Sequence, residues 1–168
     1  MTGSLSASQR FDASRRRVVL VAARFNSVLV DQLIAGARQA WRDHGGHDHR
    51  LLVERVPGAF ELPLVAKMFA ASGEVDAVVA LGCVIRGDTP HFDYVAGECA
   101  RGLMDAGLST GVPVIFGVLT TENQAQAEER ADVARMNKGR ESMEAALEMI
   151  ELLAPPPRKP EKKKGVWK

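Results

Sequence analysis

Short apolar runs alternate along this chain with stretches in which apolar residues recur three and four positions apart. Continuous apolar runs are typical of strands covered on both faces, and the other spacing is typical of helices. The runs predict strands at 18–23, 51–56, 75–85 and 112–119. The helical spacing predicts helices at 29–41, 62–71, 91–106, 122–134 and 138–153. This alternation predicts an α/β fold, a three-layer α/β/α sandwich around a four-stranded parallel sheet.

The two ends of the chain differ in composition from the part between them. Residues 1–14 are rich in Ser, Ala and polar side chains and are expected to form a flexible N-terminal segment. Residues 155–168, with the sequence PPPRKPEKKKGVWK, hold too few apolar side chains to build a core. They are expected to form a basic disordered tail, which leaves residues 15–154 as one domain.

Composition and charge narrow the range of partners and locations. The formal net charge of +1 predicts no nucleic-acid partner. No apolar run approaches the roughly 18 residues of a membrane helix, so no membrane partner is expected. The first residues lack the apolar core of a signal peptide, and the cytoplasm is the expected location. In that compartment Cys83 and Cys99 are expected as buried thiols.

The segment from Leu81 to Tyr94, LGCVIRGDTPHFDY, carries the strongest chemical signal. An apolar strand ends there, a glycine turn follows, and a new helix begins near His91. The start of a helix beyond the carboxyl end of a parallel strand offers free N–H groups to an anion. His91 adds a side chain that transfers protons near neutral pH. The pattern predicts a phosphate seat beside an acid–base group, to which Asp88 would contribute its N–H rather than its side chain.

Other residues near predicted strand ends allow two interpretations each. Phe25 and Phe116 can stack on a flat heterocycle or cap the core of the sheet. Glu61 can accept hydrogen bonds from hydroxyl groups or cap the start of a helix. Arg130 can grip a phosphate or lie solvated on a helix surface. The histidines of HGGHDHR at 44–50 match no closed zinc pattern, so no metal site is predicted there.

Five segments together resemble the lumazine synthase family, which acts in riboflavin biosynthesis. They are ARFN at 23–26, VPGAFELP at 56–63, VALGCVIRGDTPHFDYV at 79–95, VPVIFGVLTTEN at 112–123, and ERA with NKG at 129–131 and 137–139. The resemblance implies a flavodoxin-like fold. It also implies condensation of 5-amino-6-(D-ribitylamino)uracil with 3,4-dihydroxy-2-butanone 4-phosphate to 6,7-dimethyl-8-ribityllumazine, with release of phosphate and water. Such a reaction needs juxtaposition and proton transfer but no metal or redox cofactor.

The resemblance also implies a role for each matching residue. His91 would be the catalytic proton-transfer group. The residues implied to hold the uracil and its ribityl chain are Phe25, Asn26, Ala59, Phe60, Glu61, Cys83, Val84 and Ile85. Those implied to hold the phosphate, to cover the ring or to lie near the same edge are Asp88, Thr89, Phe116, Arg130 and Lys138. Phe116 and Arg130 would come from a neighbouring subunit, in a homopentamer or a multiple of pentamers.

Two alternatives from other functional classes remain at this point. A non-catalytic flavin- or lumazine-binding protein could use the same aromatic edge, although storage needs no site for a leaving phosphate. A shell-forming protein would assemble and have no turnover. A flavodoxin-like signalling domain is disfavoured, because the first strand does not end in an acidic phosphorylation pocket.

Overall fold

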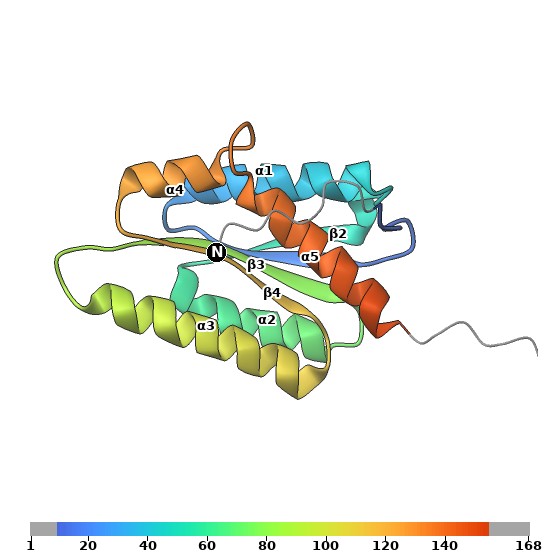
Figure 1. Ribbon diagram of the computed structural model, residues 1–168. Helices are drawn as coiled ribbons and strands as arrows, with labels where there is room; N and C mark the ends of the chain where they lie inside the picture. The colour runs from blue at the N-terminus through green and yellow to red at the C-terminus, as the bar shows by residue number, and fades with distance from the viewer. Residues whose placement is uncertain (1–9, 155–168) are drawn as a thin grey trace, which may run out of the picture.

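A computed structural model describes residues 10–154 and contains a four-stranded parallel sheet (Figure 1). In spatial order its strands are β2 (Leu51–Val56), β1 (Val18–Ala23), β3 (Ala77–Ile85) and β4 (Val114–Thr121). β1 and β3 are therefore central, whereas β2 and β4 are the two edges of the sheet. The predicted parallel sheet is confirmed.

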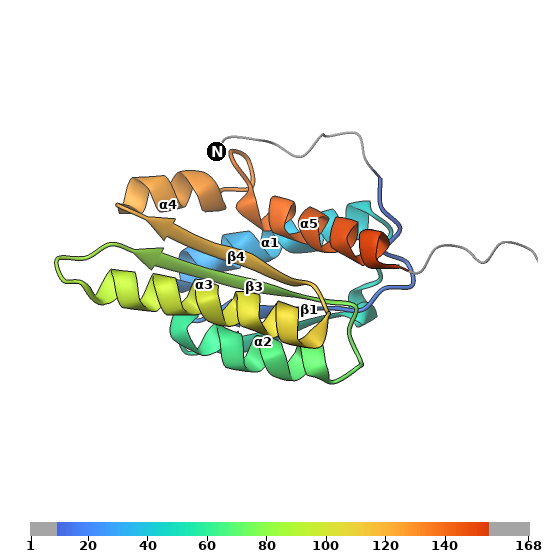
Figure 2. The ribbon, with the colours of Figure 1, turned by 60° about the horizontal axis from the view of Figure 1, so that its bottom comes forward.

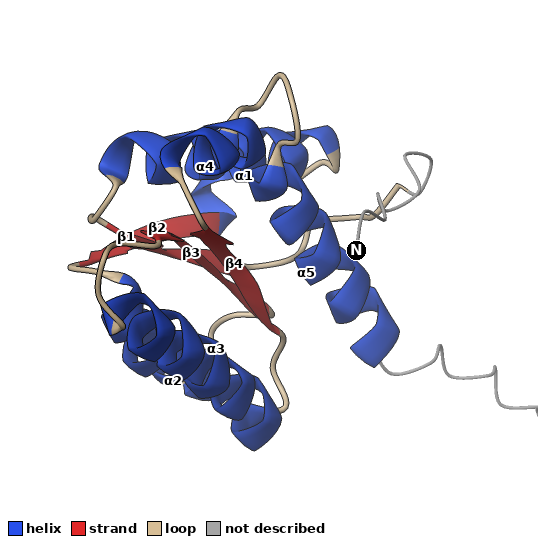
Figure 3. Cartoon of the chain, turned by 60° about the vertical axis from the view of Figure 1, so that its left-hand side comes forward, coloured by secondary structure: helices blue, strands red, loops and turns tan. Residues whose placement is uncertain are grey.

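Helices cover both faces of the sheet, which makes the predicted three-layer α/β/α sandwich (Figures 2 and 3). One face carries α1 (Ser27–Asp43), α4 (Gln124–Ala131) and α5 (Lys138–Leu153). The other face carries α2 (Leu62–Ala71) and α3 (His91–Thr110). Two short 3₁₀ turns, η1 (Asp48–Arg50) and η2 (Ala59–Glu61), lie in the connections on either side of β2. Among residues 10–154, none of these helices is both long and apolar enough to cross a bilayer.

Strand β1 divides the core into two halves. All six of its side chains are buried, and successive side chains of a strand point to opposite faces. Val18, Leu20 and Ala22 pack with α1, α4 and α5, whereas Val19 and Val21 pack with α2 and α3. This double burial explains why the strand is a continuous apolar run rather than an alternating one.

Strand β4 runs two residues further than predicted and is not broken at Gly117. The strand continues to Thr121, because it pairs with β3 in an unbroken register. Gly117 is needed for packing: a Cβ there would lie 2.7 Å from Leu81 Cδ2 and 2.8 Å from the carbonyl oxygen of Ala80. Gly117 therefore allows the middle of β4 to lie close to β3.

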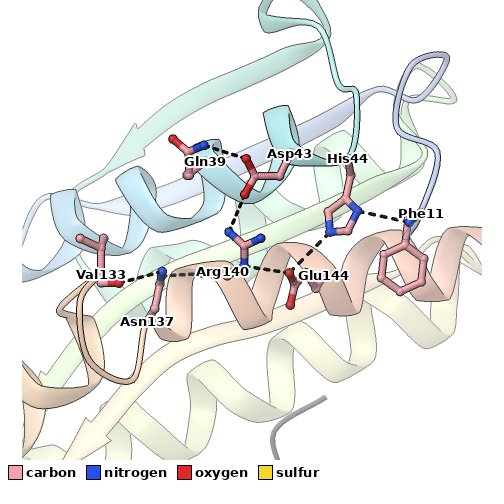
Figure 4. A network of polar contacts seen from close by, with 8 residues as sticks. All are labelled: Phe11, Gln39, Asp43, His44, Val133, Asn137, Arg140 and Glu144. Atoms are coloured by element: carbon pink, nitrogen blue, oxygen red, sulfur yellow. Dashed lines mark hydrogen bonds and ion pairs between the residues drawn. The ribbon is translucent and has the colours of Figure 1, made fainter. Parts of the chain in front are cut away.

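The packed chain begins before residue 15. Phe11 and Ala13 are buried, and the N–H of Phe11 donates to His44 Nδ1 at 3.2 Å (Figure 4). That bond leaves the ring proton on Nε2, which faces Glu144 Oε1 at 3.5 Å. Residues 10–14 therefore pack against α1 and α5. Residues 1–9 and the expected basic tail at 155–168 lie outside the described part of the chain.

A polar network next to His44 joins α1 to α5 (Figure 4). Arg140 Nη1 donates to Asp43 Oδ2 at 2.7 Å, and Arg140 Nε lies 2.9 Å from Glu144 Oε1. The hydrogen bond from Arg140 lowers the pKa of the Asp43 carboxyl below its usual value. The two helices also approach closely, since a Cβ on Gly139 would lie 2.0 Å from the carbonyl oxygen of Leu33. This contact fixes the start of α5.

Candidate active site

The carboxyl ends of β1, β2 and β3 lie at one edge of the sheet, and the loops that leave them border a cleft of about 660 Å³. The start of α3 closes another side of this cleft. Nine of the predicted site residues line this cleft: Phe25, Ala59, Phe60, Glu61, Cys83, Val84, Ile85, Thr89 and His91. We call it the His91 cleft. Asn26 and Asp88 do not line it.

The loop after β1 presents an aromatic ring to the cleft. The Phe25 side chain is 71% exposed, and its N–H donates to the carbonyl oxygen of Pro57 at 3.1 Å. Asn26 takes the left-handed conformation with a φ of 55°, and its Nδ2 donates to the Cys83 carbonyl at 2.9 Å. Asn26 therefore joins the β1 loop to the end of β3, and this hydrogen bond keeps the neighbouring Phe25 at the cleft. Its side chain was expected beside the uracil ring.

The turn after β2 contributes a carboxylate to the cleft. Glu61 Oε2 accepts a hydrogen bond from the N–H of Gly58 at 2.9 Å and so caps the η2 turn. The same residue lines the cleft, together with the exposed Phe60 and the buried Ala59. The capping interpretation of Glu61 is therefore confirmed. The carboxylate has a second oxygen that can accept hydrogen bonds, so the ligand-binding interpretation stays a prediction.

The end of β3 forms the apolar floor of the cleft. Cys83, Val84 and Ile85 line it, and the thiol of Cys83 is free and buried, as is that of Cys99. Burial raises the pKa of the Cys83 thiol to about 11, so the group is neutral near pH 7. A buried neutral thiol is a poor nucleophile. The Cys83 thiol is therefore unsuited to covalent chemistry near pH 7, and the carbonyl of Cys83 is the group that binds Asn26.

The loop after β3 brings the residues of the predicted anion seat and the histidine together. Gly87, Thr89 and His91 line the cleft, and His91 is the first residue of α3. The first N–H groups of a helix lack partners within the helix and favour an anion. The side chain predicted to transfer protons therefore lies at a helix start that can favour an anion, and an exposed aromatic ring, that of Phe25, lines the same cleft.

A second hollow of about 390 Å³ lies along the edge of β4, against α4 and α5. We call it the Arg130 hollow. It is lined by the other predicted residues, Phe116, Arg130 and Lys138. Phe116 does not lie at the carboxyl edge of the sheet where it was expected. It pairs with Ala80 in the middle of the strand ladder, because β4 continues for five residues beyond it.

The Arg130 hollow is cationic. Arg130 Nη1 donates to the carbonyl oxygen of Gln126 at 3.0 Å, and among residues 10–154 no carboxylate lies within ion-pair distance of its guanidinium. Lys138 Nζ lies 2.6 Å from Glu141 Oε2 on the same helix. Two cations therefore face one carboxylate, which suits an anionic group. No residue lines both this hollow and the His91 cleft.

Comparison with known proteins identifies the family. The sequence matches the profile of the family described as 6,7-dimethyl-8-ribityllumazine synthase over residues 15–154. The chain belongs to this family. A protein of Chlorobium phaeovibrioides (strain DSM 265 / 1930) named 6,7-dimethyl-8-ribityllumazine synthase is 50% identical to it over 142 residues, which cover 84% of this chain and 92% of that relative. The resemblance to lumazine synthases is thereby confirmed.

For a member of the lumazine synthase family, the cleft contains residues that sequence reasoning did not single out. Pro57, Gly58, Phe92, Tyr94 and Val95 also line it. A helical signal points to Tyr94, because it lies three residues after His91 and so on the same face of α3. Pro57 and Gly58 belong to the segment VPGAFELP that carries the family resemblance, and they reach the cleft through the turn after β2.

The histidine-rich segment after α1 has structural contacts in this family member. His44 is buried against Phe11 and Glu144. His47 and His49 stack on each other, with ring centres 5.5 Å apart. Within residues 10–154, no three His, Cys, Asp or Glu side chains are grouped closely enough to hold a metal ion.

Proposed function

We propose that this chain condenses 5-amino-6-(D-ribitylamino)uracil with 3,4-dihydroxy-2-butanone 4-phosphate to 6,7-dimethyl-8-ribityllumazine, with release of phosphate and water, in riboflavin biosynthesis. Family membership supports this reaction. The structural observation that carries it is the His91 cleft. There an exposed aromatic ring, a carboxylate turn, an anion-binding helix start and a histidine surround one cavity.

The chemistry divides into steps that this arrangement suits. The primary amine of the uracil attacks the ketone, and loss of water gives a Schiff base. Phosphate then leaves, and the ribitylamino nitrogen closes the second ring with loss of a further water. Protons must leave the attacking nitrogens and reach the departing oxygens, and His91 is placed for these transfers. Holding both substrates in reactive geometry supplies much of the remaining acceleration.

Each wall of the cleft has a distinct role in this proposal. The Phe25 ring stacks on the pyrimidine, and the backbone groups of Val84 and Ile85 border its polar edge. Glu61 and the η2 turn accept hydroxyl groups of the ribityl chain. Thr89 and the free N–H groups around Asp88 receive the phosphate. These groups hold both substrates, and neither the reaction nor the proposed residues call for a metal or redox cofactor.

We further propose that the complete site forms between two neighbouring subunits. A leaving phosphate requires cationic contacts, and the cations predicted for it, Arg130 and Lys138, line a hollow separate from the His91 cleft. β4 is an edge strand, and Phe116 on it is 42% exposed. A neighbour that presents this edge to the His91 cleft would complete the site. Repeated by rotation, such a heterologous contact closes a ring, here a homopentamer or a multiple of pentamers.

The direct test supplies the purified full chain with both substrates and follows formation of the fluorescent lumazine, with and without a chelator. Equal formation under both conditions supports the proposal. Tight binding of the product without turnover would instead identify a flavin- or lumazine-binding protein. Assembly into large particles with neither binding nor turnover would identify a shell-forming protein.

A further inference from the structure

The end of α3 that carries His91 is not anchored by a buried apolar side chain. His91 is the first residue of the helix, whereas the first buried residue of α3 is Cys99, two turns later. The cap residue, Pro90, makes no side-chain hydrogen bond to the helix. Most helices in proteins are fixed by burial of an apolar face. Val95, one turn after His91, is only partly buried against the core, so a polar contact can contribute to fixing this end.

Arg86 makes contact with the two residues that follow His91. Its Cζ lies 4.1 Å from the centre of the Phe92 ring, and its Nη1 lies 3.0 Å from Asp93 Oδ1. A planar guanidinium can stack on an aromatic ring and pair with a carboxylate at the same time. The contact holds the first turn of α3 immediately on the C-terminal side of the histidine.

Arg86 is itself fixed to the sheet. Its N–H donates to the carbonyl oxygen of Thr121 at 2.9 Å, which continues the ladder between β3 and β4. Its Nε donates to Glu122 Oε2 at 2.9 Å, in the turn after β4. The chain from Arg86 to Asp93 is therefore closed into a loop by one side chain, and His91 lies inside that loop. Figure 1 shows this connection between β3 and α3 as a long excursion beyond the sheet.

We propose that Arg86 is a positioning residue for the condensation: it holds the first turn of α3 so that His91 faces the cleft. Arg86 does not line the cleft, and its guanidinium is engaged by two carboxylates and a ring. It therefore acts through His91 and not on the substrates. This inference rests on the proposed function, because it concerns the rate of the same reaction.

The first experiment compares Arg86→Met and Arg86→Lys with a matched control, Arg101→Met. Arg101 lies on α3, the helix that begins with His91, and like Arg86 it pairs with two carboxylates, here Glu98 and Asp105, but it does not line the cleft. Arg86→Met lowers kcat about tenfold and leaves the KM for the uracil within about twofold, since misplacing a catalytic group costs rate rather than binding. Arg86→Lys keeps the charge and lowers kcat only about threefold. Arg101→Met stays within about twofold of the parent.

The second experiment repeats Arg86→Met in a His91→Ala background. A residue that acts through His91 has little left to position once the imidazole is gone, so kcat falls further by less than about twofold. An equal tenfold fall in both backgrounds, or an Arg101→Met effect as large, would overturn the inference. If Arg86→Met does not fold, the same cycle with Arg86→Lys decides, because its threefold loss must disappear in the His91→Ala background. A parent protein without turnover would contradict the proposed function instead.

Discussion

The His91 cleft and the Arg130 hollow are built in different ways. Loops that leave three neighbouring strands form the cleft, its floor is apolar, and three exposed aromatic rings line it, those of Phe25, Phe60 and Tyr94. One edge strand and two helices form the hollow, which carries two cations. The cleft has the shape and apolar surface to hold a heterocycle, whereas the hollow has the charge to hold a phosphate. Each region therefore has a property that the other lacks.

This difference shows how the free edge of the sheet can serve the reaction. An exposed edge strand risks unwanted pairing, and proteins usually cover such an edge. Here the edge strand carries Phe116, and Arg130 follows on the next helix. A neighbouring subunit that covers the edge would protect it and complete the site at the same time. Substitutions in each region test whether the cleft of one subunit and the hollow of its neighbour form one site.

The largest expected effect is on the cleft side, at His91. The change His91→Ala lowers kcat about 10²-fold, the scale of losing a general acid–base group, while affinity for the product changes much less. Steady-state lumazine formation between about pH 6 and 8 and a product titration measure the two effects. A variant that keeps the full rate over this range would make the histidine structural.

On the hollow side, Arg130→Ala raises the KM for the butanone phosphate about thirtyfold, because a charge-assisted hydrogen bond contributes about 2 kcal/mol. Inorganic phosphate inhibits the parent competitively and this variant only weakly. Arg135→Ala is the control, since Arg135 pairs with Asp132 and does not line the hollow. Unchanged phosphate inhibition in Arg130→Ala would remove this residue from the site.

Mixing the two variants tests whether the regions meet between subunits. His91→Ala and Arg130→Ala proteins are dissociated, combined and reassembled. The rate is measured with the butanone phosphate well below its KM, where both variants are slow. Random pairing around a ring leaves roughly a quarter of the interfaces with both residues intact, so the rate of the mixture rises about 25-fold above that of His91→Ala and about eightfold above that of Arg130→Ala. Each variant reassembled alone is the control, and native mass spectrometry verifies the mixed rings. Verified mixed rings with no more activity than the mean of the two variants would place the whole site within one subunit.

A smaller effect is expected at Phe25, because stacking contributes less than a charged contact. The change Phe25→Ala weakens binding of the uracil by about 1 to 2 kcal/mol and leaves the butanone phosphate unaffected. Phe25→Trp retains affinity, since a larger ring offers the same face. Separate titrations of the two substrates measure this. Equal weakening of both would indicate a folding defect instead of lost stacking.

The local pattern of apolar residues was sufficient to predict the bounds of some elements. β1 and α5 have the predicted bounds, because each combines a clear period with unambiguous ends. The same local pattern did not predict the position of Phe116, which sequence reasoning placed near a strand end because Gly117 follows it. Only the pairing of β4 with β3 shows that the strand continues, and that pairing joins residues far apart in the chain.

The predicted site residues show the same limit. Residue type and spacing pointed to His91, Phe25 and Arg130, and the resemblance placed Arg130 on a neighbouring subunit, but neither predicted the contacts that hold the site residues in place. The contact of Asn26 depends on a carbonyl group 57 residues away. The contact between Arg86 and Glu122 likewise spans 36 residues. Such contacts depend on the folded sheet, and no local pattern encodes them.

The smallest effect is expected at Cys83, where the cleft uses backbone groups. Burial holds the pKa of this thiol at about 11, above its ordinary value of 9.0. A group whose pKa is raised by folding costs stability only as the pH rises through the unfolded value toward the folded one, so the thiol has no influence near pH 7. Cys83→Ala therefore changes kcat by no more than about twofold and leaves the pH dependence of the rate unchanged. It lowers the free energy of unfolding by about 1 kcal/mol through the small cavity that it leaves. Rate profiles and urea unfolding of parent and variant check both statements, and a displaced pH profile would mean that the thiol takes part in the chemistry.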